Sequence, residues 1–200
     1  MLSVESLIYS FALRLMDIPK LNIIIAYILR PIFKHRRIVR TMLNDIIYSK
    51  ILDYGCGEGL FSNCFVKTKY IGYDPAVKKI IQAKKIFSNY KFLSEIPDFH
   101  VFDLFFFNSV FHHMKPNEVQ IIIENVAKYA KHNSRLMIIE LKPIYQQTNF
   151  ILKLILHLES RIHYSEPRAQ SFYEQEMQNQ GFALTDKKDL GAYYLLLYKK

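Results

Sequence analysis

The stretch Ile51–Gly59 constrains the fold of this chain more than any other feature. It begins with a short apolar run and ends with glycine at alternate positions, 55, 57 and 59. The apolar run is typical of a strand buried in a parallel sheet. Glycine permits tight turns and lets a ligand approach the backbone, because no Cβ is in the way. Apolar residues then recur at helical spacing from Leu60 to Phe65, so we expect a strand, a glycine turn and a helix, with a ligand at the carboxyl end of the sheet.

Two classes of nucleotide ligand use such a turn, and its acidic residues discriminate between them. A dinucleotide turn has the pattern G-x-G-x-x-G and holds a pyrophosphate, whereas this chain has Leu60 at the third glycine position. Asp53 and Glu58 lie within the stretch and would repel phosphate groups. S-adenosylmethionine has no phosphate and carries a sulfonium and an ammonium, so the acidic turn favours it.

The pattern Asp53-x-Gly-x-Gly-x-Gly59 resembles the first motif of the class I S-adenosylmethionine-dependent methyltransferases. In that family a second acid at the end of the next strand binds the ribose hydroxyls, and Asp74 stands at the matching position here. The resemblance implies a three-layer Rossmann-like α/β domain with a mainly parallel seven-stranded sheet and an antiparallel last strand, preceded by N-terminal helices. The alternative is an ordinary strand, turn and helix with capping acids.

The resemblance also assigns the cofactor site, with S-adenosylmethionine as methyl donor and S-adenosylhomocysteine as product. Asp53 and the glycine backbone would hold the amino-acid end, and Asp74 the ribose. The adenine amino group is left to Glu95 or to the backbone, since only a few residues follow the third strand before the fourth begins. The full set of expected cofactor-binding residues is Asp53, Tyr54, Gly55, Cys56, Gly57, Gly59, Asp74, Pro75, Glu95, Asn108 and Ser109.

The fourth strand, expected over 101–107, leads into a histidine pair, His112 and His113. This segment resembles one found in small-molecule methyltransferases such as those of quinone biosynthesis. Imidazole titrates near neutral pH, so either ring is a candidate catalytic base. The alternative is that the rings orient the substrate or satisfy loop backbone, because methyl transfer depends mainly on alignment of the reacting atoms. No metal site is expected, since two cysteines are too few for a metal cluster.

We expect residues 1–37 to form an N-terminal helical cap and residues 38–200 to form the methyltransferase domain. In the cap, the apolar run Leu21–Leu29 is followed by Arg30 and by the basic run Lys34–Arg37. These indicate either peripheral contact with a membrane or a helix packed over the active site with a solvated basic end. The apolar run is shorter than the ~20 residues that a membrane span requires, and no signal-peptide pattern is present, so we expect a cytoplasmic protein, with peripheral attachment to a membrane as the open alternative.

An apolar helical insertion is expected at about 142–168. It would cover a lipophilic acceptor, with polar contacts from Arg161, His163 and Tyr164, or it would pack against the N-terminal helices. Elsewhere, periodicity and turn residues predict a second group of elements. These are strands at 69–74, 90–93, 135–141, 182–185 and 192–198, and helices that begin at residues 38, 75, 116 and 171.

The predicted function is methyl transfer from S-adenosylmethionine to a small, apolar acceptor. The net charge of +9 attracts acidic partners, so a nucleic-acid methyltransferase is the first alternative. Amino-directed base methyltransferases carry an Asn/Asp-Pro-Pro-aromatic motif after the fourth strand, whereas this chain has Asn108-Ser109-Val110-Phe111, so nucleic acid is disfavoured as a partner. The second alternative is a non-catalytic, membrane-associated protein that retains the cofactor pocket.

Overall fold

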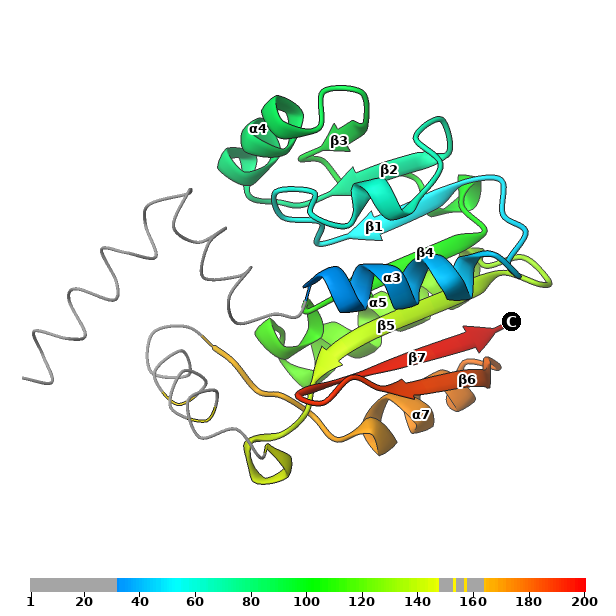
Figure 1. The fold of residues 1–200 in the computed structure, drawn as a ribbon. Helices are drawn as coiled ribbons and strands as arrows, with labels where there is room; N and C mark the ends of the chain where they lie inside the picture. The colour runs from blue at the N-terminus through cyan, green and yellow to red at the C-terminus, as the bar shows by residue number, and fades with distance from the viewer. Residues whose placement is uncertain (1–31, 148–152, 154–156, 158–163) are drawn as a thin grey trace, which may run out of the picture.

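The computed structural model describes residues 32–147, 153, 157 and 164–200, and the account below concerns these residues (Figure 1). Their strands form one seven-stranded sheet in the order β3-β2-β1-β4-β5-β7-β6. The strands are β1 (Ile51–Tyr54), β2 (Tyr70–Tyr73), β3 (Lys91–Leu93), β4 (Leu104–Asn108), β5 (Arg135–Leu141), β6 (Ala183–Asp189) and β7 (Tyr193–Lys199).

The first five strands are parallel, and β7 alone among the seven strands runs in the opposite direction, so that β6 has the same direction as the first five. β1 pairs with β2 on one side and with β4 on the other, so that Asp53 lies opposite both Gly72 and Phe106. β7 runs antiparallel to β5, and β6 antiparallel to β7. The strand order reverses between β1 and β4, which is the position where open α/β sheets bind ligands. The predicted fold class is therefore confirmed.

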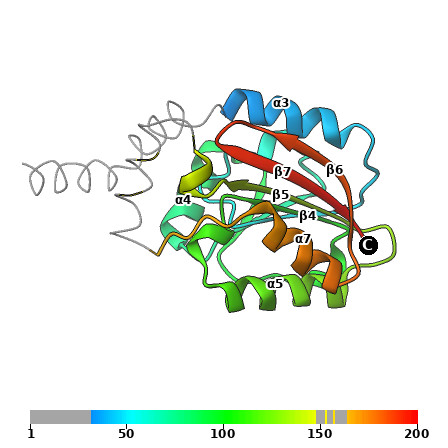
Figure 2. The same cartoon turned by 90° about the horizontal axis from the view of Figure 1, so that it is seen from below.

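Helices cover both faces of the sheet and make three layers (Figure 2). α3 (Ile32–Leu43) and α4 (Val77–Ile86) contribute to one buried cluster, and α5 (Pro116–Tyr129) and α7 (Gln170–Asn179) contribute to the other. None of the helices in the described ranges is long and apolar enough to cross a membrane. Short 3-10 helices complete the described elements: η1 (Ser62–Cys64), η2 (Phe99–Val101), η3 (Phe111–His113) and η4 (Ile144–Gln146).

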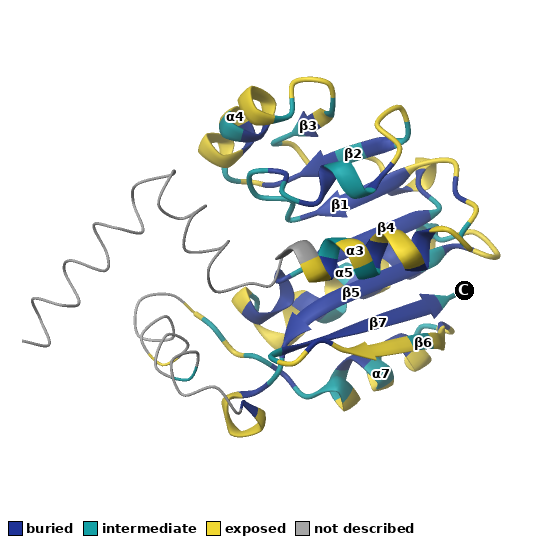
Figure 3. Ribbon diagram, viewed as in Figure 1, coloured by how far each residue is buried: buried dark blue, intermediate teal, exposed yellow. Residues whose placement is uncertain are grey.

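The central strand β4 shows why this sheet has two apolar faces. Its side chains alternate between the two clusters, with Phe106 on the α3 side and Phe105 and Phe107 on the α5 side, and none of the three is exposed. Phe106 packs against the rings of Phe61 and Phe65, with centroids 5.4 and 5.3 Å away. Burying each such side chain contributes about 1.5–3 kcal/mol. The central strands β1, β4 and β5 are accordingly dark blue over most of their length in Figure 3.

The helix predicted after the glycine turn is wrong. Residues 59–69 form turns and the short η1, because Gly59 at φ +76° interrupts helical geometry at the start of the segment. Phe61 and Phe65 still point into the core, which explains their helix-like spacing. The long helix on this part of the sheet is instead α3, whose Arg40 donates to the carbonyl of Asn63 in η1 at 3.0 Å.

Several predicted boundaries also shift. β4 begins at Leu104 instead of 101, because Asp98 caps η2 by accepting from His100 N at 3.0 Å. The helix predicted from residue 75 begins at Val77. The helix predicted from Ser171 begins at Gln170, with no capping side chain. The helix predicted from residue 38 begins at Ile32. The β5 bounds and the start of α5 at Pro116 are confirmed.

Candidate cofactor and acceptor site

The glycine loop is bound to the end of β2 by its own backbone. Gly55 N and Cys56 N both donate to the carbonyl of Tyr73, at 2.7 and 2.9 Å. Gly57 N donates to Asp74 Oδ2 at 3.0 Å. All three loop glycines have positive φ, a conformation that glycine adopts without steric cost. The loop therefore has one geometry, fixed against the neighbouring strand.

The surroundings of the glycines show which side of the loop is open. A Cβ on Gly55 would lie 2.5 Å from Val110 Cγ2, and a Cβ on Gly59 would lie 2.7 Å from the ring of Phe92. A Cβ on Gly57 would meet nothing within 4 Å. Gly55 and Gly59 are thus required for packing, whereas Gly57 leaves room for a ligand beside the backbone.

Asp74 accepts hydrogen bonds both from the glycine loop and from the segment that follows β2. Its side chain is 6% exposed, Oδ1 accepts from Ala76 N at 2.9 Å, and Oδ2 accepts from Gly57 N. Each carboxylate oxygen can accept a further hydrogen bond. The group is held rigidly and can still accept from two hydroxyls on one ligand, which fits the ribose role that the sequence predicts.

Asp53 is buried beneath the loop. It is 2% exposed, and Oδ2 accepts from the hydroxyl of Tyr70 at 2.6 Å. Burial, together with the charge of Asp74, raises the pKa of Asp53 to about 7 against the lowering effect of the Tyr70 bond. A cation near the loop would favour the ionised form of this carboxyl.

The remaining predicted cofactor residues differ in exposure. Tyr54 is buried, with its ring 4.9 Å from that of Tyr73, whereas Pro75 and Glu95 are exposed. At the end of β4, Asn108 is half-buried. Ser109 has φ +56°, which is unusual for a residue with a side chain. Its buried Oγ has no hydrogen-bond partner among the described residues, so a polar ligand atom would satisfy it.

Beyond β4, a buried carboxylate organises the histidine turn. Glu140 Oε1 accepts from Val110 N and Phe111 N, both at 2.7 Å, and Oε2 lies 2.7 Å from His112 Nδ1. Glu140 and His112 are almost completely buried, with side-chain exposures of 0% and 1%. Burial alone would raise the pKa of Glu140, but His112 and the two N–H donors hold it below its usual range.

The two histidines therefore have different environments. The His113 ring is 4.0 Å from the His112 ring, but its side chain is exposed. Desolvation by the surrounding residues, together with the adjacent His112, lowers the pKa of His113 to about 4. His113 is accordingly neutral at physiological pH and accessible to a ligand, whereas His112 is fixed by Glu140.

Arg168 fastens the segment after β5 onto the same turn. Its guanidinium donates to the carbonyls of Phe111 at 2.8 Å and Met114 at 2.5 Å, and the side chain is 6% exposed. Glu166 N donates to the carbonyl of His112 at 2.7 Å. Sequence reasoning missed Glu140 and Arg168, because no local pattern marks a residue whose partners lie 28 to 57 positions away.

Of the predicted acceptor-binding residues, the structure describes Tyr164 alone. It is 44% exposed, and its hydroxyl donates to the carboxylate of Glu166. Arg161 and His163 lie outside the described residues, as does most of the predicted apolar helix. Among the residues that are described, no three histidine, cysteine or acidic side chains gather in a way that could hold a metal ion.

Comparison with known proteins agrees with this geometry. A family model described as "Methyltransferase domain" matches residues 25–187. No curated protein sequence matches the chain. Among solved structures, human N-acetylserotonin methyltransferase in complex with S-adenosylmethionine has a TM-score of 0.64 at 19% identity, over 82% of this chain and 51% of that one.

Two further structures extend the comparison. A putative O-methyltransferase from Nostoc punctiforme has a TM-score of 0.66 at 15% identity, over 84% of this chain and 56% of that one. Magnesium protoporphyrin IX methyltransferase from Synechocystis with bound S-adenosylhomocysteine has a TM-score of 0.60 at 16% identity, over 83% of each chain. This chain thus spans about half the length of the first two structures. At these identities the likeness concerns the fold.

The family match covers most of the chain, and the fold, the glycine loop and Asp74 agree with it. The predicted methyltransferase family is thereby confirmed, and two of the structures that share the fold hold S-adenosylmethionine or S-adenosylhomocysteine. The chain belongs to the methyltransferase-domain family and has the class I fold.

Proposed function

We propose that this protein transfers the methyl group of S-adenosylmethionine to a small, lipophilic acceptor in the cytoplasm. The observation that carries the proposal is the cradle formed by Asp74 and the loop at Gly57, where a rigid carboxylate with spare acceptor capacity lies beside an open stretch of backbone. A carboxylate at the end of the second strand suits a ribose, and its bond from Gly57 N occupies a loop N–H that a pyrophosphate would otherwise use.

The residues divide the binding of the cofactor between them. Asp74 would accept from the ribose hydroxyls, and Asp53 with the loop backbone would hold the cationic amino-acid end. The buried hydroxyl of Ser109, which has no partner within the described part of the chain, would meet the methionine side, since Ser109 follows the adjacent strand β4. The bound cofactor supplies an electrophilic methyl group, and the protein's task is to align the acceptor with it.

In this proposal His113 contacts the acceptor and His112 is a positioning residue. A ring with a pKa of about 4 is a weak base. We therefore infer that His113 accepts a hydrogen bond from the acceptor and orients it. Glu140 fixes His112 through Nδ1, and the contact between the two tilted rings, 4.0 Å apart, thus gives the His113 ring a defined position.

The lipophilic character of the acceptor rests on the segment after β5. Tyr145 is 76% exposed and Ile144 is 39% exposed, and both follow the carboxyl end of a central strand. Apolar side chains at such an edge favour binding of an apolar molecule. Arg161, His163 and Tyr164, which come later in the same segment, are the proposed polar contacts to it.

Two measurements test the proposal. Calorimetry should show binding of S-adenosylmethionine and S-adenosylhomocysteine and much weaker binding of NAD, and a preference for the pyrophosphate nucleotide would refute the cofactor assignment. Formation of S-adenosylhomocysteine should then be followed with lipid extract or with RNA as the acceptor source. Turnover with RNA alone would favour a nucleic-acid methyltransferase, and no turnover with either would favour a non-catalytic protein.

A further inference from the structure

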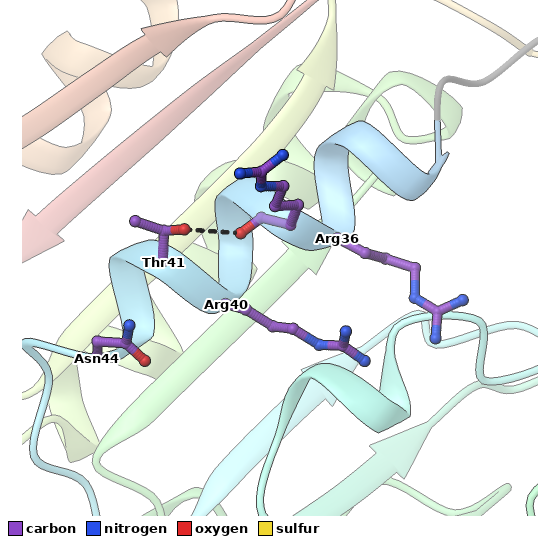
Figure 4. Close-up of a pocket in the computed structure, with 5 residues that line it drawn as sticks. Arg36, Arg40, Thr41 and Asn44 are labelled. Carbon is purple, nitrogen blue, oxygen red and sulfur yellow. Dashed lines mark hydrogen bonds between the residues drawn. The ribbon is translucent and has the colours of Figure 1, made fainter.

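The two sides of α3 have opposite character. His35, Val39, Met42 and Leu43 are buried, at the spacing of one helix face. The outward positions line a surface pocket of about 310 Å³ (Figure 4). The pocket residues are Arg36, Arg37, Arg40, Thr41 and Asn44. Figure 2 shows α3 as the outermost described layer on its side of the sheet, so this pocket opens away from the core.

The positive charge of the pocket is not neutralised within the described part of the chain. α3 contains Lys34, Arg36, Arg37 and Arg40 and no acidic residue. Among the ion pairs of the described residues, none involves these three arginines. The nearest acid in the sequence is Asp45, which is exposed beyond the end of the helix. Guanidinium groups present planar pairs of donors that match phosphate oxygens, so the pocket suits a phosphate-bearing ligand.

A second groove, of about 570 Å³, adjoins the first and shares Arg40 and Asn44 with it. Ile47 and Val66 line this groove and are 100% and 51% exposed. Lys69 lies beside them. Exposed aliphatic side chains next to cations are typical of a surface that rests in the boundary between lipid headgroups and acyl chains.

We propose that the outer face of α3 docks on an anionic membrane surface, where its arginines Arg36, Arg37 and Arg40 bind lipid phosphates. Ile47 and Val66 contact the acyl boundary. In the sequence the apolar run Leu21–Leu29 ends two residues before α3, which agrees with a membrane partner. RNA offers the same phosphate chemistry, but single-stranded RNA is usually held by aromatic side chains that stack on its bases, and the exposed apolar residues of these grooves are aliphatic.

Flotation of the full chain with vesicles tests the proposal. The vesicles are phosphatidylcholine alone or phosphatidylcholine with phosphatidylglycerol, at low and high salt. The triple variant Arg36→Ala/Arg37→Ala/Arg40→Ala should lower the partition coefficient on anionic vesicles by about 150-fold, because each basic residue near such a surface contributes about one kcal/mol. The double variant Arg36→Ala/Arg37→Ala, which keeps the Arg40 bond to Asn63, should lower it by about 30-fold.

Matched variants separate the pocket from general charge. Lys84→Ala/Lys85→Ala/Lys91→Ala removes the same charge from exposed positions on α4 and β3 and should retain most of the binding. S-adenosylmethionine affinity should be unchanged in the α3 variants, which reports their folding independently of the proposed reaction. Equal flotation of the double variant and the wild type would overturn the proposal. So would equal binding to neutral vesicles, or tight RNA binding that the α3 variants lose while vesicle binding stays weak.

Discussion

The two halves of the carboxyl edge of the sheet are held together in different ways. Between β1 and β2, backbone N–H groups of the glycine loop donate to the end of the next strand, and Gly57 and Asp74 are 17 residues apart. Between β4 and β5, the contacts run through buried side chains, and Arg168 reaches Phe111 across 57 residues. The half at β1 and β2 depends on local backbone geometry. The half at β4 and β5 depends on the buried carboxylate of Glu140 and on all its hydrogen-bond partners.

This difference separates binding from stability. Substitutions in the loop half should act mainly on cofactor affinity, because its carboxylate oxygens keep acceptor capacity for a ligand. Substitutions in the histidine half should act mainly on the free energy of unfolding, because removing one partner there leaves buried polar groups unsatisfied.

The largest expected effect is that of Glu140→Ala. Three buried donors, Val110 N, Phe111 N and His112 Nδ1, would lose their acceptor together. We expect the free energy of unfolding to fall by about 3–5 kcal/mol, measured by urea denaturation. Glu118→Ala, which removes an exposed cap contact of α5, should cost about 1 kcal/mol. Equal losses for the two variants would show that the histidine half does not depend on its buried charge.

The contact between Glu140 and His112 also predicts that the free energy of unfolding depends on pH. Because the folded pKa of Glu140 lies below its value of 4.5 in the unfolded chain, its contribution to stability is present above about pH 4.5 and is lost as the pH falls through the folded pKa. In Glu140→Gln this acid-dependent part should disappear. The measurement is the free energy of unfolding at several pH values between 3 and 6. If this free energy depended on pH in Glu140→Gln as steeply as in the wild type, the assignment would be contradicted.

The next largest effect is expected for Asp74→Ala in the loop half. The change removes the acceptor of Gly57 N and the proposed acceptor of both ribose hydroxyls. Since a hydrogen bond to a charged group contributes about 1.5–3 kcal/mol, we expect S-adenosylmethionine affinity in calorimetry to fall about 100-fold. His113→Gln, in the other half, should leave this affinity unchanged. Unchanged affinity in Asp74→Ala would remove the ribose assignment.

What could be predicted from the sequence follows the same division. The glycine turn, Asp74 and the bounds of β5 were predictable, because glycine geometry and apolar runs are local properties. The left-handed conformation of Asn133 before β5, with φ +72°, was predictable for the same reason.

The remaining features depend on contacts between distant residues. The apolar spacing from Leu60 to Phe65 matches a helix, yet these side chains fill the core from a 3-10 turn while α3 supplies the covering helix. Glu140 lies inside an apolar strand, where the sequence gives no sign that its partners are the N–H groups of the histidine turn. Hydrophobic periodicity indicates which side chains are buried, but it does not indicate which buried polar groups form hydrogen bonds with each other.

A smaller effect in the loop half concerns Asp53. Its raised pKa of about 7 means that ionisation lowers the stability of the free protein as the pH rises from about 4 to 7. A cationic ligand favours the ionised form, so binding of S-adenosylmethionine near pH 6 should release up to one proton. Calorimetry in two buffers of different ionisation enthalpy measures this release. Asp53→Asn should release none from this site, and an equal release from both proteins would exclude Asp53 as the source.

The smallest effect is expected for Glu95→Ala. Glu95 follows β3 and is exposed, so any bond from it to an adenine amino group competes with water. We therefore expect S-adenosylmethionine affinity to fall by less than about fivefold, corresponding to under about 1 kcal/mol, with backbone groups after β3 providing the main adenine contact. Asp74, in contrast, is 6% exposed and is held by two N–H donors. Calorimetry of the two alanine variants would compare their losses of S-adenosylmethionine affinity. A loss for Glu95→Ala as large as that for Asp74→Ala would mean that the bound cofactor excludes water from Glu95, so that exposure in the free protein is a poor guide to its role.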